Sequence, residues 1–183
     1  MSNSVTADDV LNFWFETCSP KDWFSSSDEM DQTITKRFAD TLKAASQCEL
    51  SGWRCNAMGR LAEIIVLDQF SRNIYRGNAQ AFTQDSLALA LAQEVVSQGI
   101  DQRYIAKHRA FVYMPYMHSE SRIIHRQAEI LFNVPELEQS YAFELKHKLI
   151  IDQFGRYPHR NTLLGRTSTE EELTFLAQPG SSF

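Results

Sequence analysis

The sequence predicts an all-α protein. Breakers of regular structure are few, with seven glycines and five prolines among 183 residues. The apolar residues recur every three or four positions, and no segment shows the alternation of a half-buried strand. A chain of this length, 43% apolar, is also long enough to bury a core of its own. We therefore expect a single all-helical domain over residues 1–183, built as an irregular bundle or a short solenoid.

Helix starts and ends follow from capping residues and breakers. Thr6 before two aspartates predicts the first helix start, and Ser27 predicts the second. Thr83 opens a later helix that Gly99 ends, because glycine adopts the left-handed conformation common at helix C-termini. Thr169 opens a short last helix, where three glutamates favour the positive end of the helix dipole. Further helices are expected at about 56–72, 104–114, 119–132 and 137–154, and the second should end near residue 47.

Composition argues against several classes of protein. A net charge of −5 and a pI near 5.5 are unlike a general nucleic-acid-binding protein, which usually has a basic surface. The first nine residues lack the pattern of a secretory signal, and no apolar stretch approaches the ~18 residues of a membrane span. The three cysteines show no CxxC spacing, so we expect neither disulfides nor zinc, and a cytoplasmic location. Nucleic acid and membrane are not expected as partners, and the oligomeric state stays open.

One charged phrase occurs twice. DQFSRNIYRGN begins at Asp68, DQFGRYPHRNT begins 84 residues later at Asp152, and five of eleven positions are identical. In a helix, each acid and the arginine four residues on share a stripe with the apolar residues three and seven positions before the acid. An acid on an apolar face is expected to be buried, and a buried carboxylate needs a partner. We therefore expect Asp68 to pair with Arg72 and Asp152 to pair with Arg156.

The two phrases also predict a binding site. Each continues past its helix end with further basic residues, Arg76 in the first copy and His159 and Arg160 in the second. If the two helix ends converge across a polar pocket, their guanidinium groups match the paired oxygens of a carboxylate or phosphate. The predicted ligand-binding residues are Asp68, Arg72, Arg76, Asp152, Arg156, His159 and Arg160. The same charges would equally serve structure alone, with the arginines capping carbonyls at the helix ends.

A second polar cluster follows the aromatic segment within FVYMPYMHSES, residues 111–121. Pro115 is expected to break or kink the helix there, and Ser119 can cap the next one. Glu120 shares a stripe with apolar positions of that next helix, so we expect it to point inward. His118 and Glu120 are the candidate catalytic residues, because such a pair can transfer protons near neutral pH. Alternatively, His118 is a hydrogen-bonded residue at a helix junction.

No pattern for a metal, a cofactor or a nucleophile accompanies these residues. The histidines and acids lack an HExxH or similar spacing, and no glycine-rich phosphate loop is present. No serine or cysteine has the setting of a catalytic nucleophile. We expect neither metal nor cofactor, and whether the chain is an enzyme stays open. The expected partner is a small anionic ligand or, alternatively, an acidic or C-terminal peptide clamped by the arginines.

Three segments together resemble the bacterial family of unknown function numbered 924. They are GRLAEIIVLDQFSRNIYRGNAQAFTQD, HRAFVYMPYMHSE and FGRYPHRNTLLGRTSTEEELTFL, and the resemblance covers nearly the whole chain. It implies a tetratricopeptide-like helical fold and no established activity, although the chain shows no clear repeat of about 34 residues. Ser71 departs from the family, which often has proline there. The matching residues are Asp68, Gln69, Phe70, Arg72, Asn73, Arg76, Gly77, Pro115, His118, Ser119, Glu120, Phe154, Arg156, Pro158, His159, Arg160, Asn161, Gly165 and Arg166.

Overall fold

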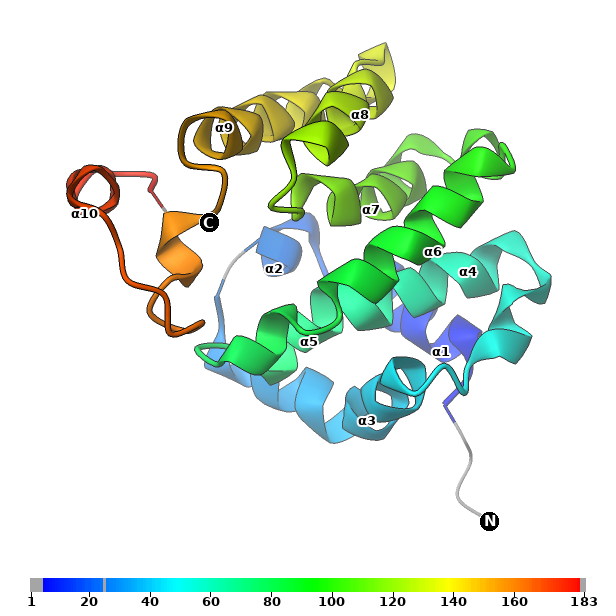
Figure 1. Ribbon diagram of the computed structural model, residues 1–183. Coiled ribbons are helices and arrows are strands. Elements are labelled where there is room, and N and C mark those ends of the chain that lie inside the picture. Colours follow the sequence, from blue (N-terminus) through cyan, green and yellow to red (C-terminus); the bar gives the residue numbers. More distant parts are fainter. Residues whose placement is uncertain (1–4, 25, 182–183) are drawn as a thin grey trace.

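The computed structural model describes residues 5–24 and 26–181, and the fold of this part is all-α (Figure 1). Short 3₁₀ and π-helical turns join or extend the α-helices. The α-helices are α1 (Ala7–Asn12), α2 (Pro20–Phe24), α3 (Asp28–Ser46), α4 (Ala57–Ile65), α5 (Ser71–Ile74), α6 (Asp85–Ser97), α7 (Ala106–Met117), α8 (Arg122–Phe132), α9 (Glu138–Phe154) and α10 (Glu170–Leu176).

Capping residues begin and end these helices where the sequence predicts. Thr6 and Thr169 each form a capping box with the acid three residues on, before α1 and α10. The Ser27 hydroxyl accepts a backbone N–H at the start of α3. Gly99 follows the end of α6 with a φ of +66°, a conformation that disfavours side chains with a Cβ. The predicted starts and ends are confirmed at these four positions.

Pro115 was predicted to break or kink its helix; the break is wrong, because α7 continues past Pro115 to Met117. A proline inside a helix costs about 3 kcal/mol. All eight residues from Ala110 to Met117 are buried, and this packing outweighs that cost. The residue at the N-cap position of the next helix, α8, is Ser121 and not Ser119, and its side chain makes no capping hydrogen bond in the described part of the chain. Glu120 therefore precedes α8 and does not lie on its inner stripe.

The core surrounds the helical segment that carries the first charged phrase. Every residue from Leu61 to Ser71 is buried, across α4 and the π-helical turn Val66–Phe70. Aromatic rings pack against this turn: the Phe70 ring centroid lies 4.7 Å from that of Phe38 and 5.5 Å from that of Trp14. Asp68 is thus carried into the interior by a segment that is apolar on most sides.

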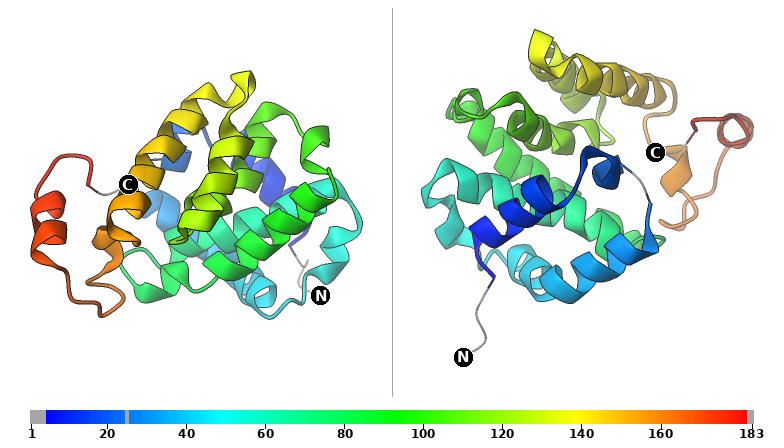
Figure 2. Two further views of the ribbon diagram at one scale, coloured as in Figure 1. Left: turned by 45° about the horizontal axis from the view of Figure 1, so that its top comes forward. Right: turned by 180° about the vertical axis from the view of Figure 1, so that it is seen from behind.

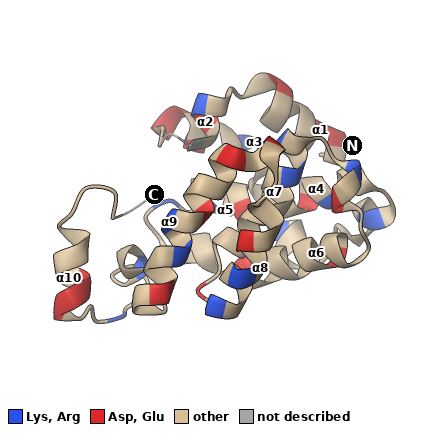
Figure 3. Cartoon of the chain, turned by 90° about the horizontal axis from the view of Figure 1, so that it is seen from above, with Lys and Arg blue, Asp and Glu red and all other residues tan. Residues whose placement is uncertain are grey.

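The C-terminal third of the chain packs on the outer side of α7 (Figures 1 and 2). Helices α8 and α9 form an antiparallel pair there, and the segment after α9 turns back toward α7 before α10, which lies at the edge of the molecule. Acidic and basic positions are interspersed over α8 and α9 (Figure 3). Among the helices in the described part, none has the length and apolarity that a membrane crossing requires.

Candidate functional site

Asp68 is the more deeply buried of the two acids that begin the charged phrases, with 1% of its surface exposed. His118 Nδ1 lies 2.7 Å from Oδ1, and Arg72 Nη1 lies 3.2 Å from the same oxygen, so the predicted pair with Arg72 is present. The Gln69 amide donates to Oδ2 over 2.6 Å. Burial raises the pKa of Asp68, but the charges and hydrogen bonds of these partners outweigh it and hold the pKa well below its usual range. Asp68 is therefore ionised at neutral pH.

His118 caps the end of α7, and its ring is oriented by Asp68. Because the Asp68 carboxylate can only accept, His118 Nδ1 must carry a hydrogen, which leaves Nε2 as the basic nitrogen. Burial and the charge of Arg72 lower the pKa of His118, so the ring is neutral at pH 7. The side chain is 16% exposed and lines a cavity. A neutral imidazole in this setting can accept a proton.

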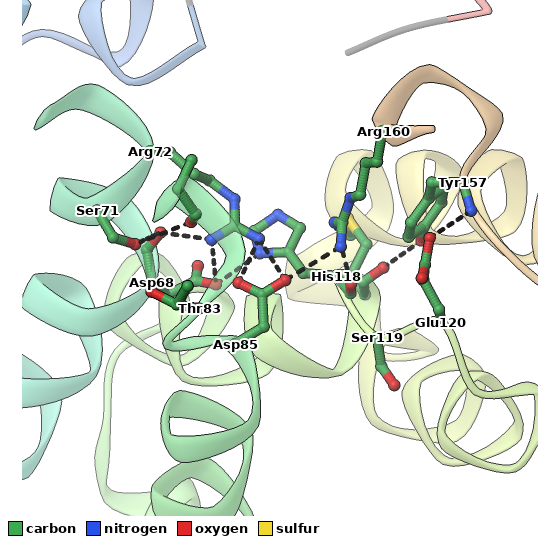
Figure 4. A network of polar contacts seen from close by, with 12 residues as sticks. Asp68, Ser71, Arg72, Thr83, Asp85, His118, Ser119, Glu120, Tyr157 and Arg160 are labelled. Carbon is green, nitrogen blue, oxygen red and sulfur yellow. Dashed lines mark hydrogen bonds and ion pairs between the residues drawn. The ribbon is translucent and has the colours of Figure 1, made fainter. Parts of the chain in front are cut away.

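Asp85 joins two arginines that come from different copies of the phrase (Figure 4). Arg72 Nη2 and Arg160 Nη1 each lie 3.1 Å from Asp85 Oδ2. Asp85 is the first residue of α6, where the positive end of the helix dipole favours an acid. Arg160 also donates to the backbone carbonyl of His118 over 3.1 Å. One continuous network thus links Asp68, His118, Arg72, Asp85 and Arg160.

Arg160 lies between two aromatic rings. Its guanidinium carbon is 4.5 Å from the ring centroid of Phe82 and 4.6 Å from that of Tyr157, so cation–π contacts cover the group. The residue is 6% exposed, and its buried Nε has no hydrogen-bond partner in the described part of the chain. Burial and the neighbouring Arg72 lower the pKa of Arg160. The charged form would be stabilised by an added anion.

A cavity of about 300 Å³ opens beside this network. At about 30 Å³ for each water in the liquid, that is room for ~10 water-sized groups, the lower end of ligand-binding cavities. The polar lining residues are Thr83, Asp85, Ser86, His118, Ser119, Glu120 and Arg160, and the apolar ones are Ala79, Phe82, Leu89, Pro115 and Leu164. The cavity therefore combines an apolar side with a charged side.

Glu120 lines the cavity but makes a different set of contacts from His118. Its oxygens accept from Arg166 over 2.7 and 2.9 Å, and Oε1 also accepts the Tyr157 N–H over 2.7 Å. Burial raises the pKa of Glu120, but these bonds outweigh it and lower the pKa below its ordinary value. Glu120 is thus ionised and doubly paired. It attaches the segment after α9 to the loop that carries His118.

Arg76 and His159 lie outside the cavity lining. Arg76 donates to Asp31 of α3 through Nε over 2.5 Å and through Nη2 over 2.9 Å, and its side chain is 42% exposed. His159 stacks at a tilt against Tyr157, with ring centroids 5.6 Å apart. Burial lowers the pKa of His159 to about 4, so it is neutral at pH 7. The cavity beside His118 is therefore not lined by either residue.

The predicted pairing of Asp152 with Arg156 is wrong. Asp152 is 43% exposed and accepts from Lys148 over 2.6 Å. Arg156 instead donates to Glu172 of α10, from Nε over 2.7 Å and from Nη2 over 2.8 Å. Helix α9 ends before Gly155, whose φ is +72°, so Arg156 leaves in a direction that no longer faces Asp152.

Asp85 and Phe82 are among the contributors to the site that were not predicted from the sequence. Asp85 follows the helix start predicted at Thr83, and an acid in a first helical turn is explained by the helix dipole alone. Phe82 is one of many apolar positions. Their roles depend on Arg72 and Arg160, which lie 13 and 75 residues away from Asp85, and no local signal marks such contacts. In the described part, no group of three or more His, Cys, Asp and Glu residues could hold a metal ion.

Comparisons with known proteins identify relatives without naming an activity. Residues 10–180 match a family described as a bacterial protein of unknown function, DUF924. A solved structure of the protein of unknown function ATU0120 from Agrobacterium tumefaciens is similar, with a TM-score of 0.85 and 35% sequence identity. The match covers 93% of this chain and 96% of that one. A search of the curated proteins finds no match.

Proposed function

Because the chain belongs to the bacterial family of unknown function DUF924, and no relative supplies a reaction, we propose a function from the site itself. The protein binds a small organic acid or phosphate ester in the cavity beside His118. The anionic group of this ligand meets Arg160, and its apolar part lies against Phe82 and the neighbouring apolar lining. The size of the cavity, about 300 Å³, favours a metabolite over a polymer.

The observation that carries this proposal is the state of Arg160. A guanidinium group has five N–H donors, and hydrogen bonds to Asp85 and to the His118 carbonyl use two of them. The group is buried, its Nε lacks a partner among the described residues, and its charge is destabilised by burial and by Arg72. In the network, two acids face two arginines and His118 is neutral. A bound anion would therefore meet no excess negative charge and would stabilise the charged guanidinium group of Arg160.

Asp68 and His118 support a proton-transfer role in the same cavity. A buried carboxylate that holds an imidazole through Nδ1 leaves Nε2 free to act as a base, which is the arrangement of acid and histidine in catalytic triads. We propose that His118 Nε2 accepts a proton from the bound ligand or from a water beside it. Such general-base catalysis typically contributes about 10²–10⁴-fold to a rate. Glu120 then maintains the shape of the cavity and takes no part in the proton transfer.

A peptide-binding, tetratricopeptide-like module remains the alternative with less support. Its acidic peptide would need exposed arginines, but Arg76 and Arg156 are paired with Asp31 and Glu172. A cytoplasmic location belongs to the main proposal and is supported by the three free cysteines.

Thermal unfolding with a panel of carboxylated and phosphorylated metabolites tests the proposal. A ligand at a hundredfold excess over its Kd stabilises the folded state by about 2.7 kcal/mol and raises the Tm of the wild-type protein. Arg160→Gln should lose most of this shift. Arg76→Gln is the matched control, because Arg76 occupies the equivalent position of the other phrase and is ion-paired outside the cavity. If no compound shifts the wild-type Tm, or if Arg160→Gln responds like the wild type, the proposal is wrong.

A further inference from the structure

Three successive carbonyl groups at the end of α7 accept hydrogen bonds from three distant side chains. The Tyr157 hydroxyl donates to Met117 O, and Arg160 Nη2 donates to His118 O over 3.1 Å. His125 Nε2 lies 2.8 Å from Ser119 O. Carbonyls at a helix end lack intrahelical partners, so external donors determine how the chain leaves the helix. These three bonds hold the backbone on both sides of the His118 ring.

The protonation of His125 follows from its contacts with Ser119 and Glu144; the Tyr157 hydroxyl oxygen also lies 3.2 Å from Nε2. The Ser119 carbonyl can only accept, so His125 Nε2 carries a hydrogen. Nδ1 lies 2.7 Å from Glu144 Oε1, and both side chains are fully buried. The pair therefore shares one proton, either as imidazolium and carboxylate or as imidazole and carboxylic acid. In both forms the pair is neutral and Nε2 remains a donor.

The surroundings of Glu144 favour the form with a protonated acid. Its second oxygen, Oε2, is buried without a hydrogen-bond partner in the described part, and an unpaired carboxylate oxygen is more costly than an unpaired acid carbonyl. Burial also raises the pKa of Glu144, while its bond to His125 opposes this. Glu144 then donates to Nδ1 and fixes the His125 ring with its N–H toward Ser119. Neither side chain of this pair contacts solvent, so a role on the surface does not explain why these polar groups lie in the interior.

We infer that His125, held by Glu144, is a positioning residue for His118 and acts through the Ser119 carbonyl. His125 does not line the cavity. It fixes Ser119, the residue after His118, so that the His118 ring keeps its hydrogen bond to Asp68. The chemical purpose of this arrangement rests on the proposed function, because only a His118 with a defined basic nitrogen needs such support.

Two substitutions of His125 separate positioning from stability. In Gln the side-chain nitrogen takes the place of His Nε2, so His125→Gln keeps a donor to Ser119 O and loses the contact with Glu144. In Asn the nitrogen takes the place of Nδ1, so His125→Asn keeps the contact with Glu144 and loses the donor to Ser119 O. The measurement is ¹⁵N NMR of histidine-labelled protein without ligand, which reports the tautomer of His118, and His118→Gln assigns that signal.

The wild type and His125→Gln should show His118 as the single Nδ1–H tautomer that Asp68 selects. His125→Asn should show a mixture of both tautomers, because the loop after α7 is no longer held. If His125→Asn does not fold, Glu144→Ala is the second variant. Without Glu144 the His125 hydrogen can move to Nδ1, a shift that the amide of Gln cannot make, so the donor to Ser119 O is partly lost and the mixture should appear. A single tautomer in each folded variant, or the same mixture in both His125 variants, would overturn the inference. The spectra need no ligand, so failure of the metabolite panel would reject the proposed function independently of this result.

Discussion

The two copies of the charged phrase are identical at five of eleven positions, but their acids lie in contrasting environments. Asp68 is 1% exposed and holds His118 and Arg72 in the interior. Asp152, at the same place in the second copy, is 43% exposed and meets Lys148 on the surface of α9. The acid of the first copy therefore forms part of the site, whereas the acid of the second copy does not.

The arginines of the two copies exchange roles. Arg72 and Arg76 of the first copy align with Arg156 and Arg160 of the second. In the first copy the earlier arginine binds Asp85, and Arg76 pairs outside the cavity. In the second copy Arg156 pairs outside, and the later arginine binds Asp85. The two phrases meet at Asp85, but through residues that are not equivalent.

The helix continues through the first copy but ends within the second. Ser71 continues the helix of the first copy, is fully buried, and donates its hydroxyl to the Leu67 carbonyl. Gly155 stands at the aligned position and ends α9 with a φ of +72°. An acid and an arginine four residues apart face each other only while the helix continues between them. A repeated motif thus keeps its contacts only where the helix around it continues.

The substitution expected to cost the most unfolding free energy tests the contrast between Asp68 and Asp152. Asp68→Asn leaves Arg72 and His118 without their buried carboxylate, and breaking a buried pair by removing one partner costs about 3–5 kcal/mol. Urea unfolding of the variant should show this loss in the free energy of unfolding. A loss below about 1 kcal/mol, the range of exposed ion pairs, would mean that Asp68 is solvated and that the contrast with Asp152 is false.

A second effect concerns the acid that replaces Asp152 as the partner of Arg156. Hydrogen bonds to Arg156, Asn161 and Thr169 lower the pKa of Glu172 to about 2, against about 4.3 in an unfolded chain. The folded state then binds fewer protons, so the stability from Glu172 is fully present above about pH 4.3 and is lost as the pH falls toward 2. Glu172→Gln should lose about 2 kcal/mol at pH 7, the scale of a hydrogen bond to a charged group.

The measurement is the free energy of unfolding of the wild type and Glu172→Gln between pH 7 and pH 2. The gap between them should be constant down to about pH 4.3 and should then narrow. A gap that stays constant to pH 2 would show that the carboxylate of Glu172 is not what Arg156 requires.

A third effect tests the glycine that ends α9. Gly155→Ser makes the second copy match the first at this position, but it places a Cβ in the left-handed region, at a cost of about 1–2 kcal/mol. The nearest atom to the new Cβ would be Arg122 Nη2 at 3.5 Å, an ordinary contact, so no clash adds to this cost. Gly77→Ser is the matched control, because Gly77 has a φ of +74° and open space around it. Equal losses of unfolding free energy are expected, and a much larger loss at Gly155 would indicate a packing role.

Much of the fold was predictable because helix signals are local. Capping by Thr6, Ser27 and Thr169 and the apolar stripe around Asp68 each depend on residues within a few positions. The burial of Asp68 and its pairing with Arg72 followed from the same periodicity. The signal that would have corrected the second copy was also local, since Gly155 is a common helix-ending residue.

The rest of the site could not be read from local patterns. Asp85 meets Arg160 75 residues away, Glu172 meets Asn161 11 residues away, and Arg166 meets Glu120 46 residues away. Only the tertiary packing of the segments that carry them brings these partners together. At Pro115 a strong local signal predicts a helix break that is absent, because the packing of α7 outweighs the local preference. Ion pairs at helix ends thus depend on tertiary structure more than the helices themselves do.

The smallest expected effect completes the contrast between the acids. Asp152→Asn removes an exposed pair with Lys148 four residues earlier, and such pairs contribute about 0.3–0.5 kcal/mol on helices. The free energy of unfolding should change by no more than this, and the small change should shrink further in about 1 M salt, where the Debye length is about 3 Å. The binding of any ligand found for the wild type should be unaffected, because Asp152 lies outside the cavity lining. A loss comparable to that of Asp68→Asn would show that the second acid shares the role of the first after all.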